Sequence, residues 1–219
     1  TNEPLLAPQI DERARLARQK VPNANIYILT NGTKITTKLA VDLLEAGLDY
    51  IKIDNYSNQL KLHRNVLQLV EDFERPEYHQ YSDRVFVVKR LLDEVLSNRG
   101  GSAPNKQAEV QKETYQYYAN SSCAYPFNQL IIRPDGKVSL CCNDALGKAT
   151  MGDVSRHSLV EVWRGKAFTR LRQEITTNGR KNMAICNTCD VFTHDPDALI
   201  RANAVVRTAD KLFGLRKRH

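Results

Sequence analysis

The fold class of the first half of the chain follows from the stretch Asn25-Ile-Tyr-Ile-Leu-Thr-Asn-Gly32. Its apolar, β-branched residues predict a short strand, which the Asn-Gly pair ends. A helix should follow, because Thr36 or Thr37 can cap its start and Gly47 is suited to its end. One strand followed by one helix is the first unit of an alternating pattern.

The same pattern continues along the next residues. Strands are predicted over residues 49–54 and 84–89, and apolar side chains at helical spacing predict a helix from about Asn58 to Phe73. Strands that alternate with helices pair in parallel through right-handed crossovers. The first half is therefore predicted to be α/β.

The second half has a different character. Residues 97–105 have the composition of a loop, and a domain boundary is expected there. Residues 129–133 and 137–141 flank Pro134-Asp135-Gly136, a sequence suited to the turn of a β-hairpin. Two amphipathic helices follow, the first with a capping box from Ser158. This half is predicted to be a small α+β unit.

Composition limits the classes of partner. The 219 residues carry a net charge of +7, but the basic residues are spread along the chain and do not alternate with aromatic residues. This favours a solvated basic surface over a nucleic-acid site. No apolar stretch approaches the roughly 18 residues that a membrane span needs, and the start lacks the pattern of a signal peptide. We expect a cytoplasmic protein without membrane contact.

The five cysteines all lie in the second half, beginning at Cys123. Cys186-x-x-Cys189 places two thiolates on one tight turn. The predicted hairpin brings Cys123 near Cys141 or Cys142, so four thiolates can converge. Zinc and an iron–sulfur cluster both accept four thiolates, and these residues alone do not choose between the two.

The choice between Cys141 and Cys142 depends on strand alternation. Neighbours on a strand face opposite sides. Cys142 has the same parity as Val138 and Leu140, which are expected to face the core. Cys141 is therefore predicted to face the other cysteines.

A set of short segments in fixed order gives a more specific signal. These segments are Cys123-Ala-Tyr-Pro-Phe, Ile132-Arg-Pro-Asp-Gly-Lys-Val-Ser-Leu-Cys141-Cys142-Asn-Asp, Met151-Gly-Asp-Val, Ser158-Leu-Val-Glu-Val-Trp163, Phe168-Thr-Arg-Leu-Arg172 and Cys186-x-x-Cys189. Together they resemble the SPASM/twitch domain, the auxiliary iron–sulfur domain at the C-terminus of many radical S-adenosylmethionine (SAM) enzymes. The family's Gly-x4-Cys pattern selects Gly136 and Cys141.

The resemblance implies an architecture and a ligand set. Residues 1–100 would be the later strands of a partial (β/α)6 radical SAM barrel, 101–122 a linker, 123–195 the SPASM/twitch domain and 196–219 a basic helix or tail. One auxiliary [4Fe-4S] cluster is expected, because no cysteine follows Cys189 in this chain. Its implied ligands are Cys123, Cys141, Cys186 and Cys189.

The resemblance also implies a SAM pocket. Thr1-Asn2-Glu3-Pro4 resembles the family's Gly-Gly-Glu-Pro motif, whose glutamate contacts the SAM amino group. Asn31 and Asp54 stand at the ends of predicted strands, where this fold lines the pocket. The family's Cys-x3-Cys-x2-Cys loop is absent from these residues. We therefore expect the C-terminal part of a longer enzyme, separated by truncation or a split gene, that is inactive by itself and can self-associate.

The function implied is radical hydrogen abstraction or oxidation of a peptide or small carbohydrate-like substrate. The full-length parent would also bind SAM and a second [4Fe-4S] cluster, and an electron donor such as flavodoxin or ferredoxin. A zinc-binding structural or nucleic-acid-binding module is the alternative from another class. An inactive scaffold that has lost SAM chemistry is a third possibility.

Overall fold

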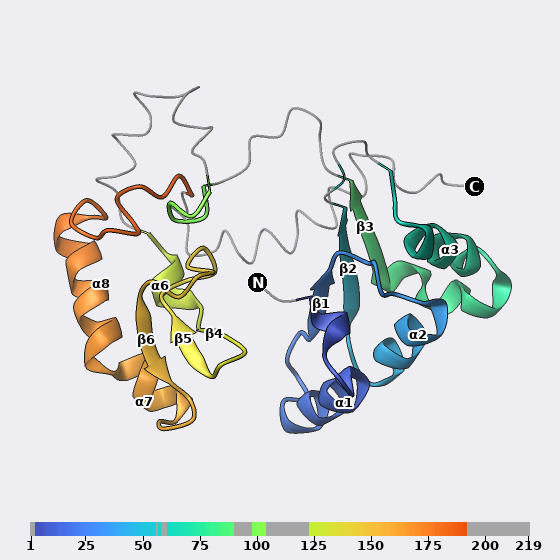
Figure 1. The fold of residues 1–219 in the computed structure, drawn as a ribbon. Helices are drawn as coiled ribbons and strands as arrows, with labels where there is room; N and C mark the ends of the chain where they lie inside the picture. The colour runs from blue at the N-terminus through green and yellow to red at the C-terminus, as the bar shows by residue number, and fades with distance from the viewer. Residues whose placement is uncertain (1–2, 56, 58–60, 90–97, 104–122, 192–219) are drawn as a thin grey trace. The chain divides into compact units, whose positions relative to one another are not determined.

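The computed structural model describes residues 3–55, 57, 61–89, 98–103 and 123–191 (Figure 1). The chain divides into one compact unit from Asn2 to Glu94 and a second that runs from Val95 to His219 and also includes Thr1. The predicted linker beyond residue 103 and the predicted tail from residue 196 lie outside the described residues.

A parallel sheet forms the centre of the first unit. Its strands are β1 (Tyr27–Thr30), β2 (Tyr50–Asn55) and β3 (Val85–Lys89), in the order β1-β2-β3. Both pairs are parallel, and Thr30 stands opposite Ile53 in the register. The predicted parallel pairing is confirmed, and the carboxyl ends of all three strands lie at one edge of the sheet.

In the described part of this unit, three α-helices accompany these strands: α1 (Ile10–Lys20), α2 (Thr37–Glu45) and α3 (Arg64–Phe73). Short 3-10 helices occupy Pro4–Leu6 (η1) and Pro76–Arg84 (η2). The Thr36 hydroxyl caps α2 by accepting from the Leu39 N–H at 3.1 Å, as predicted. The predicted start of the next helix near Asn58 is wrong, because the backbone from 61 to 63 is not helical and α3 begins only after His63.

The core of this unit lies between the helices and one sheet face. Ile51 and Ile53 on β2 are fully buried against helical residues such as Leu43 and Val66. The opposite sheet face is more open within the unit, since Tyr27 and Leu29 of β1 are exposed. Parallel strands are usually covered on both faces, so an open face is a candidate binding surface.

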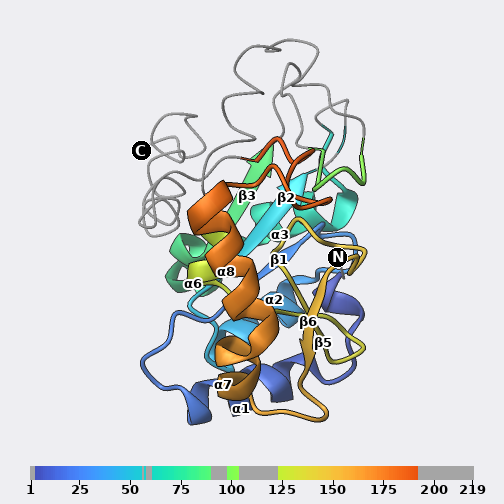
Figure 2. The same ribbon diagram turned by 90° about the vertical axis from the view of Figure 1, so that its left-hand side faces the viewer.

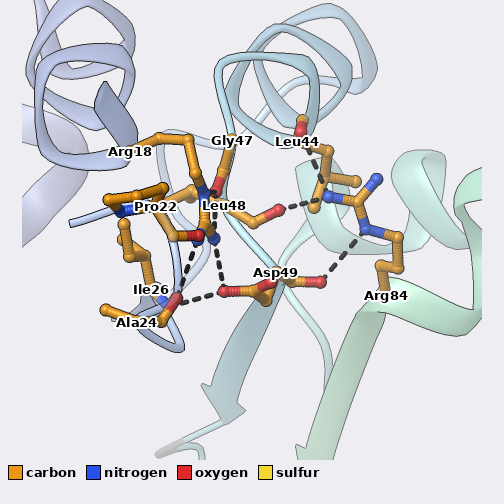
Figure 3. A network of polar contacts seen from close by, with 9 residues as sticks. All are labelled: Arg18, Pro22, Ala24, Ile26, Leu44, Gly47, Leu48, Asp49 and Arg84. Atoms are coloured by element: carbon orange, nitrogen blue, oxygen red, sulfur yellow. Dashed lines mark hydrogen bonds and ion pairs between the residues drawn. The ribbon is translucent and has the colours of Figure 1, made fainter. Parts of the chain in front are cut away.

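Two arginines form hydrogen bonds near the amino ends of the strands (Figure 3). Arg18 of α1 donates to the Asp49 carboxylate at 2.6 Å and twice to the Gly47 carbonyl, at 2.9 and 2.8 Å. Arg84 donates to the Asp49 carbonyl at 3.1 Å and to the carbonyls of Leu44 and Leu48. These bonds fix the loop before β2 and leave the carboxyl ends of the strands available for a site.

The second unit contains a small antiparallel sheet. β4 (Ile131–Ile132), β5 (Lys137–Ser139) and β6 (Thr150–Asp153) pair in that order. The predicted hairpin is confirmed, although β5 ends at Ser139. The helices are α6 (Tyr125–Asn128), α7 (Leu159–Arg164) and α8 (Lys166–Asn178). Both α7 and α8 pack against β6 (Figure 2).

Two features of the sequence segments that resemble the SPASM/twitch domain position these helices. The capping box at the start of α7 is confirmed, since Ser158 accepts from the Glu161 N–H at 3.3 Å and Glu161 accepts from the Ser158 N–H at 2.8 Å. Gly152 lets β6 approach α7 closely, because a Cβ added there would lie 2.7 Å from a Val162 methyl. The Met-Gly-Asp-Val segment therefore has a packing role.

Candidate metal centre

All five cysteines lie in the second unit, and no disulfide joins them. Cys141, Cys186 and Cys189 are buried, Cys123 is partly buried and Cys142 is exposed. Cys141 and Cys186 belong to the hydrophobic core of this unit. The three buried thiols are therefore largely shielded from water.

The cysteines lie in three separate segments of the second unit. Cys123 directly precedes the short helix α6, and Cys141 follows β5 by two residues. Cys186 and Cys189 lie on a turn after α8, in which the Cys189 N–H donates to the Cys186 carbonyl at 3.3 Å. Cys141 thus follows a hairpin strand and Cys186 and Cys189 share one tight turn, and their role as ligands stays a prediction.

The electrostatics of the thiols show that they share one neighbourhood. Burial raises the pKa of Cys141 and of Cys186 to about 12. Cys123 adds to the upward pKa shifts of both, and of Cys142 and Cys189 as well. The raised pKa values favour the protonated thiols of Cys141 and Cys186, and a bound metal would replace those protons.

Asp144 fixes the loop that carries Cys141. Its N–H donates to the Cys141 carbonyl at 3.1 Å, and its carboxylate accepts from the N–H groups of Lys148 and Ala149 at 2.7 and 3.1 Å. The Ser139 hydroxyl also donates to the Asp144 carbonyl at 3.1 Å. The buried Asp144 therefore connects Cys141, through its backbone N–H, to residues 148 and 149, through its carboxylate.

A segment that the sequence suggested was a simple loop packs on the Cys-x-x-Cys turn. The buried Asn98 donates its N–H to both Asp190 carboxylate oxygens, at 2.9 and 2.7 Å. Its side-chain oxygen accepts from the Asp190 N–H at 3.3 Å, and its side-chain nitrogen donates to the Thr188 carbonyl. Gly100 and Gly101 have positive φ and approach Ile185 and Thr188. We call residues 98–101 the clasp.

The alternation argument for Cys141 over Cys142 is wrong in its premise. β5 ends at Ser139, and residues 138 to 141 are all buried, so successive side chains do not alternate between core and solvent. Cys142 is exposed, and its sulfur accepts from the Gln129 side-chain amide at 3.8 Å. Cys141 stays a prediction as the ligand.

Among the residues that the structure describes, no three His, Cys, Asp or Glu side chains are grouped closely enough to hold one metal ion. The chemistry of the cysteine side chains nevertheless suits a metal ion or an iron–sulfur cluster. It offers thiols without disulfide partners, three of them buried, on loops held by backbone hydrogen bonds. Thiolates of this kind are ligands of both zinc and iron–sulfur clusters.

The predicted SAM-pocket residues lie in the first unit, and two of them are in contact. Glu3 accepts from the Thr30 hydroxyl at 2.5 Å, from the Asn31 N–H at 2.9 Å and from the Leu5 N–H at 3.1 Å. A carboxylate has about four lone-pair positions, so Glu3 keeps room for one further donor. Its location at the carboxyl end of β1 fits a contact with an ammonium group.

Asp54 lies near the same sheet edge but is oriented differently. Because Thr30 pairs with Ile53, Asp54 is one residue further and points to the opposite face of the sheet. It forms an ion pair with Lys52, with 3.1 Å between the charged atoms. The structure therefore brings Glu3 and Asn31 together and places Asp54 on the more open face.

Sequence reasoning missed four polar residues that surround the cysteines. Asn98, Asp144, Arg180 and Asp190 are all buried. Asp144 and Asp190 each lie close in sequence to a predicted ligand, which is a signal that could have found them. Arg180 stands in a polar stretch with no such signal, and Asn98 lies far from the cysteines along the chain.

Comparisons with known proteins agree with these observations. Residues 123–190 match the SPASM family, an iron–sulfur cluster-binding domain. Over 190 residues the chain is 27% identical to the S-adenosyl-L-methionine-dependent 2-deoxy-scyllo-inosamine dehydrogenase of Niallia circulans, covering 86% of this chain and 69% of that protein.

Two solved structures share the fold. The crystal structure of BtrN in complex with AdoMet and 2-DOIA matches with a TM-score of 0.70 and 25% identity, over 89% of this chain and 72% of that one. An open conformation of BtrN matches with a TM-score of 0.60 and 20% identity, over 86% and 67% of the two chains.

One negative finding concerns membranes. None of the helices in the described parts of the chain combines the length and the apolar character that crossing a bilayer requires. The comparisons confirm the predicted resemblance: residues 123–190 match the SPASM iron–sulfur cluster-binding domain, and the chain is similar to an S-adenosyl-L-methionine-dependent dehydrogenase in sequence and to BtrN in fold.

Proposed function

We propose that this chain is the C-terminal part of a radical SAM dehydrogenase, and that its second unit binds one auxiliary [4Fe-4S] cluster. The observation that carries this proposal is the set of buried thiols around Cys123, within a region that matches an iron–sulfur domain. The cluster ligands would be Cys123, Cys141, Cys186 and Cys189.

A [4Fe-4S] cluster held by four thiolates has no open iron position and supplies one-electron transfer when bound. The residues of this chain would hold it and keep water away. Leu140 and Phe168 are fully or almost fully buried in the same core as Cys141 and Cys186. Electrons would pass between the protein and a donor of the flavodoxin or ferredoxin class.

The proposed substrate is a small carbohydrate-like molecule, oxidised by loss of hydrogen. The relative from Niallia circulans supports this choice over a peptide, since its name specifies 2-deoxy-scyllo-inosamine dehydrogenation. Glu3 would hold the amino group of SAM, and the more open sheet face with Tyr27 and Lys52 would line the substrate side. SAM and a second [4Fe-4S] cluster would complete the enzyme.

Metal analysis tests the cluster. The chain, Cys189→Ala and the matched control Cys142→Ala would be reconstituted anaerobically with iron and sulfide and analysed for iron, sulfide and zinc. We expect about four irons and four sulfides in the chain and in Cys142→Ala, and their loss in Cys189→Ala. One zinc without sulfide would favour the structural-module alternative. Loss of iron in Cys142→Ala alone would assign Cys142 as a ligand.

Ligand binding tests the substrate class. Saturation-transfer NMR on the reconstituted chain would compare 2-deoxy-scyllo-inosamine with a short unstructured peptide. We expect transfer to the cyclitol and none to the peptide, and the reverse result would contradict the proposed substrate.

A further inference from the structure

Arg180 has the largest side chain among the fully buried residues that the structure describes, with 1% of its surface exposed. Arginine is almost never buried to this extent without partners, because its guanidinium carries a charge and five N–H donors. Arg180 follows α8 and begins the turn that leads to the Cys-x-x-Cys pair, since the Met183 N–H donates to its carbonyl at 3.2 Å.

The guanidinium and a predicted ligand share an acceptor. Arg180 Nη1 donates to the Val191 carbonyl at 2.8 Å. The Cys189 sulfur also lies 4.0 Å from this carbonyl oxygen, as a weak donor. A single carbonyl group therefore links the buried charge to Cys189.

Negatively charged groups would lie near Arg180 when a cluster is bound, because its ligands would be thiolates. Asp190 is buried beside Cys189, and its carboxylate accepts both bonds from the Asn98 N–H. Arg180 Nη1 and the Cys189 sulfur lie 2.8 and 4.0 Å from the same Val191 carbonyl oxygen. The buried guanidinium therefore lies beside the turn that carries Cys189.

We propose that Arg180 is a positioning residue for the auxiliary cluster, which holds a fixed positive charge beside the Cys186–Cys189 turn and so raises the reduction potential of the cluster. This inference rests on the proposed function. Reduction adds one negative charge to the cluster, and a nearby buried cation stabilises that added charge.

The test compares Arg180→Gln with Arg170→Gln in the reconstituted chain. Both substitutions remove one positive charge, but Arg170 lies exposed on α8, where solvent screens its charge. Iron and sulfide content is measured first, and the reduced fraction is then followed by EPR at set potentials. In Arg180→Gln, we expect the ratio of reduced to oxidised cluster at a given potential to fall about tenfold, about 59 mV for a one-electron couple. Arg170→Gln should match the unaltered chain.

Arg180→Lys separates the charge from the shape of the side chain. It keeps the positive charge, so its potential should stay closer to that of the unaltered chain than to that of Arg180→Gln. Equal potentials in Arg180→Gln and Arg170→Gln would overturn the inference. It would also be overturned if both Arg180 variants lost the cluster while Arg170→Gln kept it, because Arg180 would then serve the fold alone. Zinc without iron in the unaltered chain would refute the proposed function instead.

Discussion

The clasp makes a quantitative prediction for the variant Asn98→Ala. The substitution leaves the backbone N–H of residue 98 and its two bonds to Asp190 in place. It removes the amide oxygen that accepts from the Asp190 N–H at 3.3 Å and the amide nitrogen that donates to the Thr188 carbonyl. Both lost bonds lie on the turn that carries Cys189.

The burial of each orphaned group decides the magnitude. Asp190 is buried, so an unsatisfied N–H there costs about 1–3 kcal/mol. Thr188 is exposed, so water can replace the lost donor and the cost is about 1 kcal/mol or less. We expect Asn98→Ala to lower the free energy of unfolding of the second unit by about 1–4 kcal/mol.

Trp163 is the only tryptophan of the chain and lies on α7, so its fluorescence reports the unfolding of this unit. The assay is urea denaturation of the metal-free chain. Asn182→Ala is the matched control, since Asn182 is exposed and donates to Glu174 at 2.7 Å. The control should change stability by less than about 0.5 kcal/mol. Equal costs for both variants would refute the assignment of residues 98–101 as a clasp.

Three further predictions concern stability. Gly152→Ala should cost about 1–3 kcal/mol in urea denaturation, because its new methyl meets Val162, and no cost would contradict the close approach. Arg18→Met should cost about 2 kcal/mol in thermal or urea unfolding, and the exposed Arg15→Met less than about 0.5 kcal/mol; equal costs would count against the network of Figure 3. Burial raises the pKa of the Cys141 thiol to about 12. The contribution of this protonated thiol to the free energy of unfolding is therefore complete below about pH 9 and is lost as the pH rises toward about 12. The metal-free chain should therefore lose about 1.4 kcal/mol more than Cys141→Ala between about pH 8 and about pH 10, and parallel pH profiles would refute this.

The elements that the sequence predicted well are those whose patterns are local. β2 and α2 bury regular sets of apolar residues, and the Ser158 capping box needs only four consecutive residues. By contrast, α1 was not predicted, because it buries only Ala14 and leaves Leu16 exposed. A helix that is charged on most sides has no apolar period to detect.

The candidate site was predicted only in part, for a related reason. The spacing of Cys186 and Cys189 is local, so the sequence reveals it. The clasp joins Asn98 to Asp190, 92 positions apart, and its composition is that of a linker. Arg180 is charged and follows a glycine, which predicts exposure, yet its side chain is buried. Contacts between distant residues decide both cases.

The size of the second unit explains why its cysteines belong to its core. β4 and β5 comprise only two and three residues, and such short strands add little stability of their own. Cys141 and Cys186 occupy core positions in which larger apolar side chains would bury more surface. Ligation would join the hairpin to the turn after α8 and replace the buried thiol protons with metal charge. The free energy of metal binding would then be part of the free energy of folding, and the clasp and Asp144 would hold the ligand loops before metal binds.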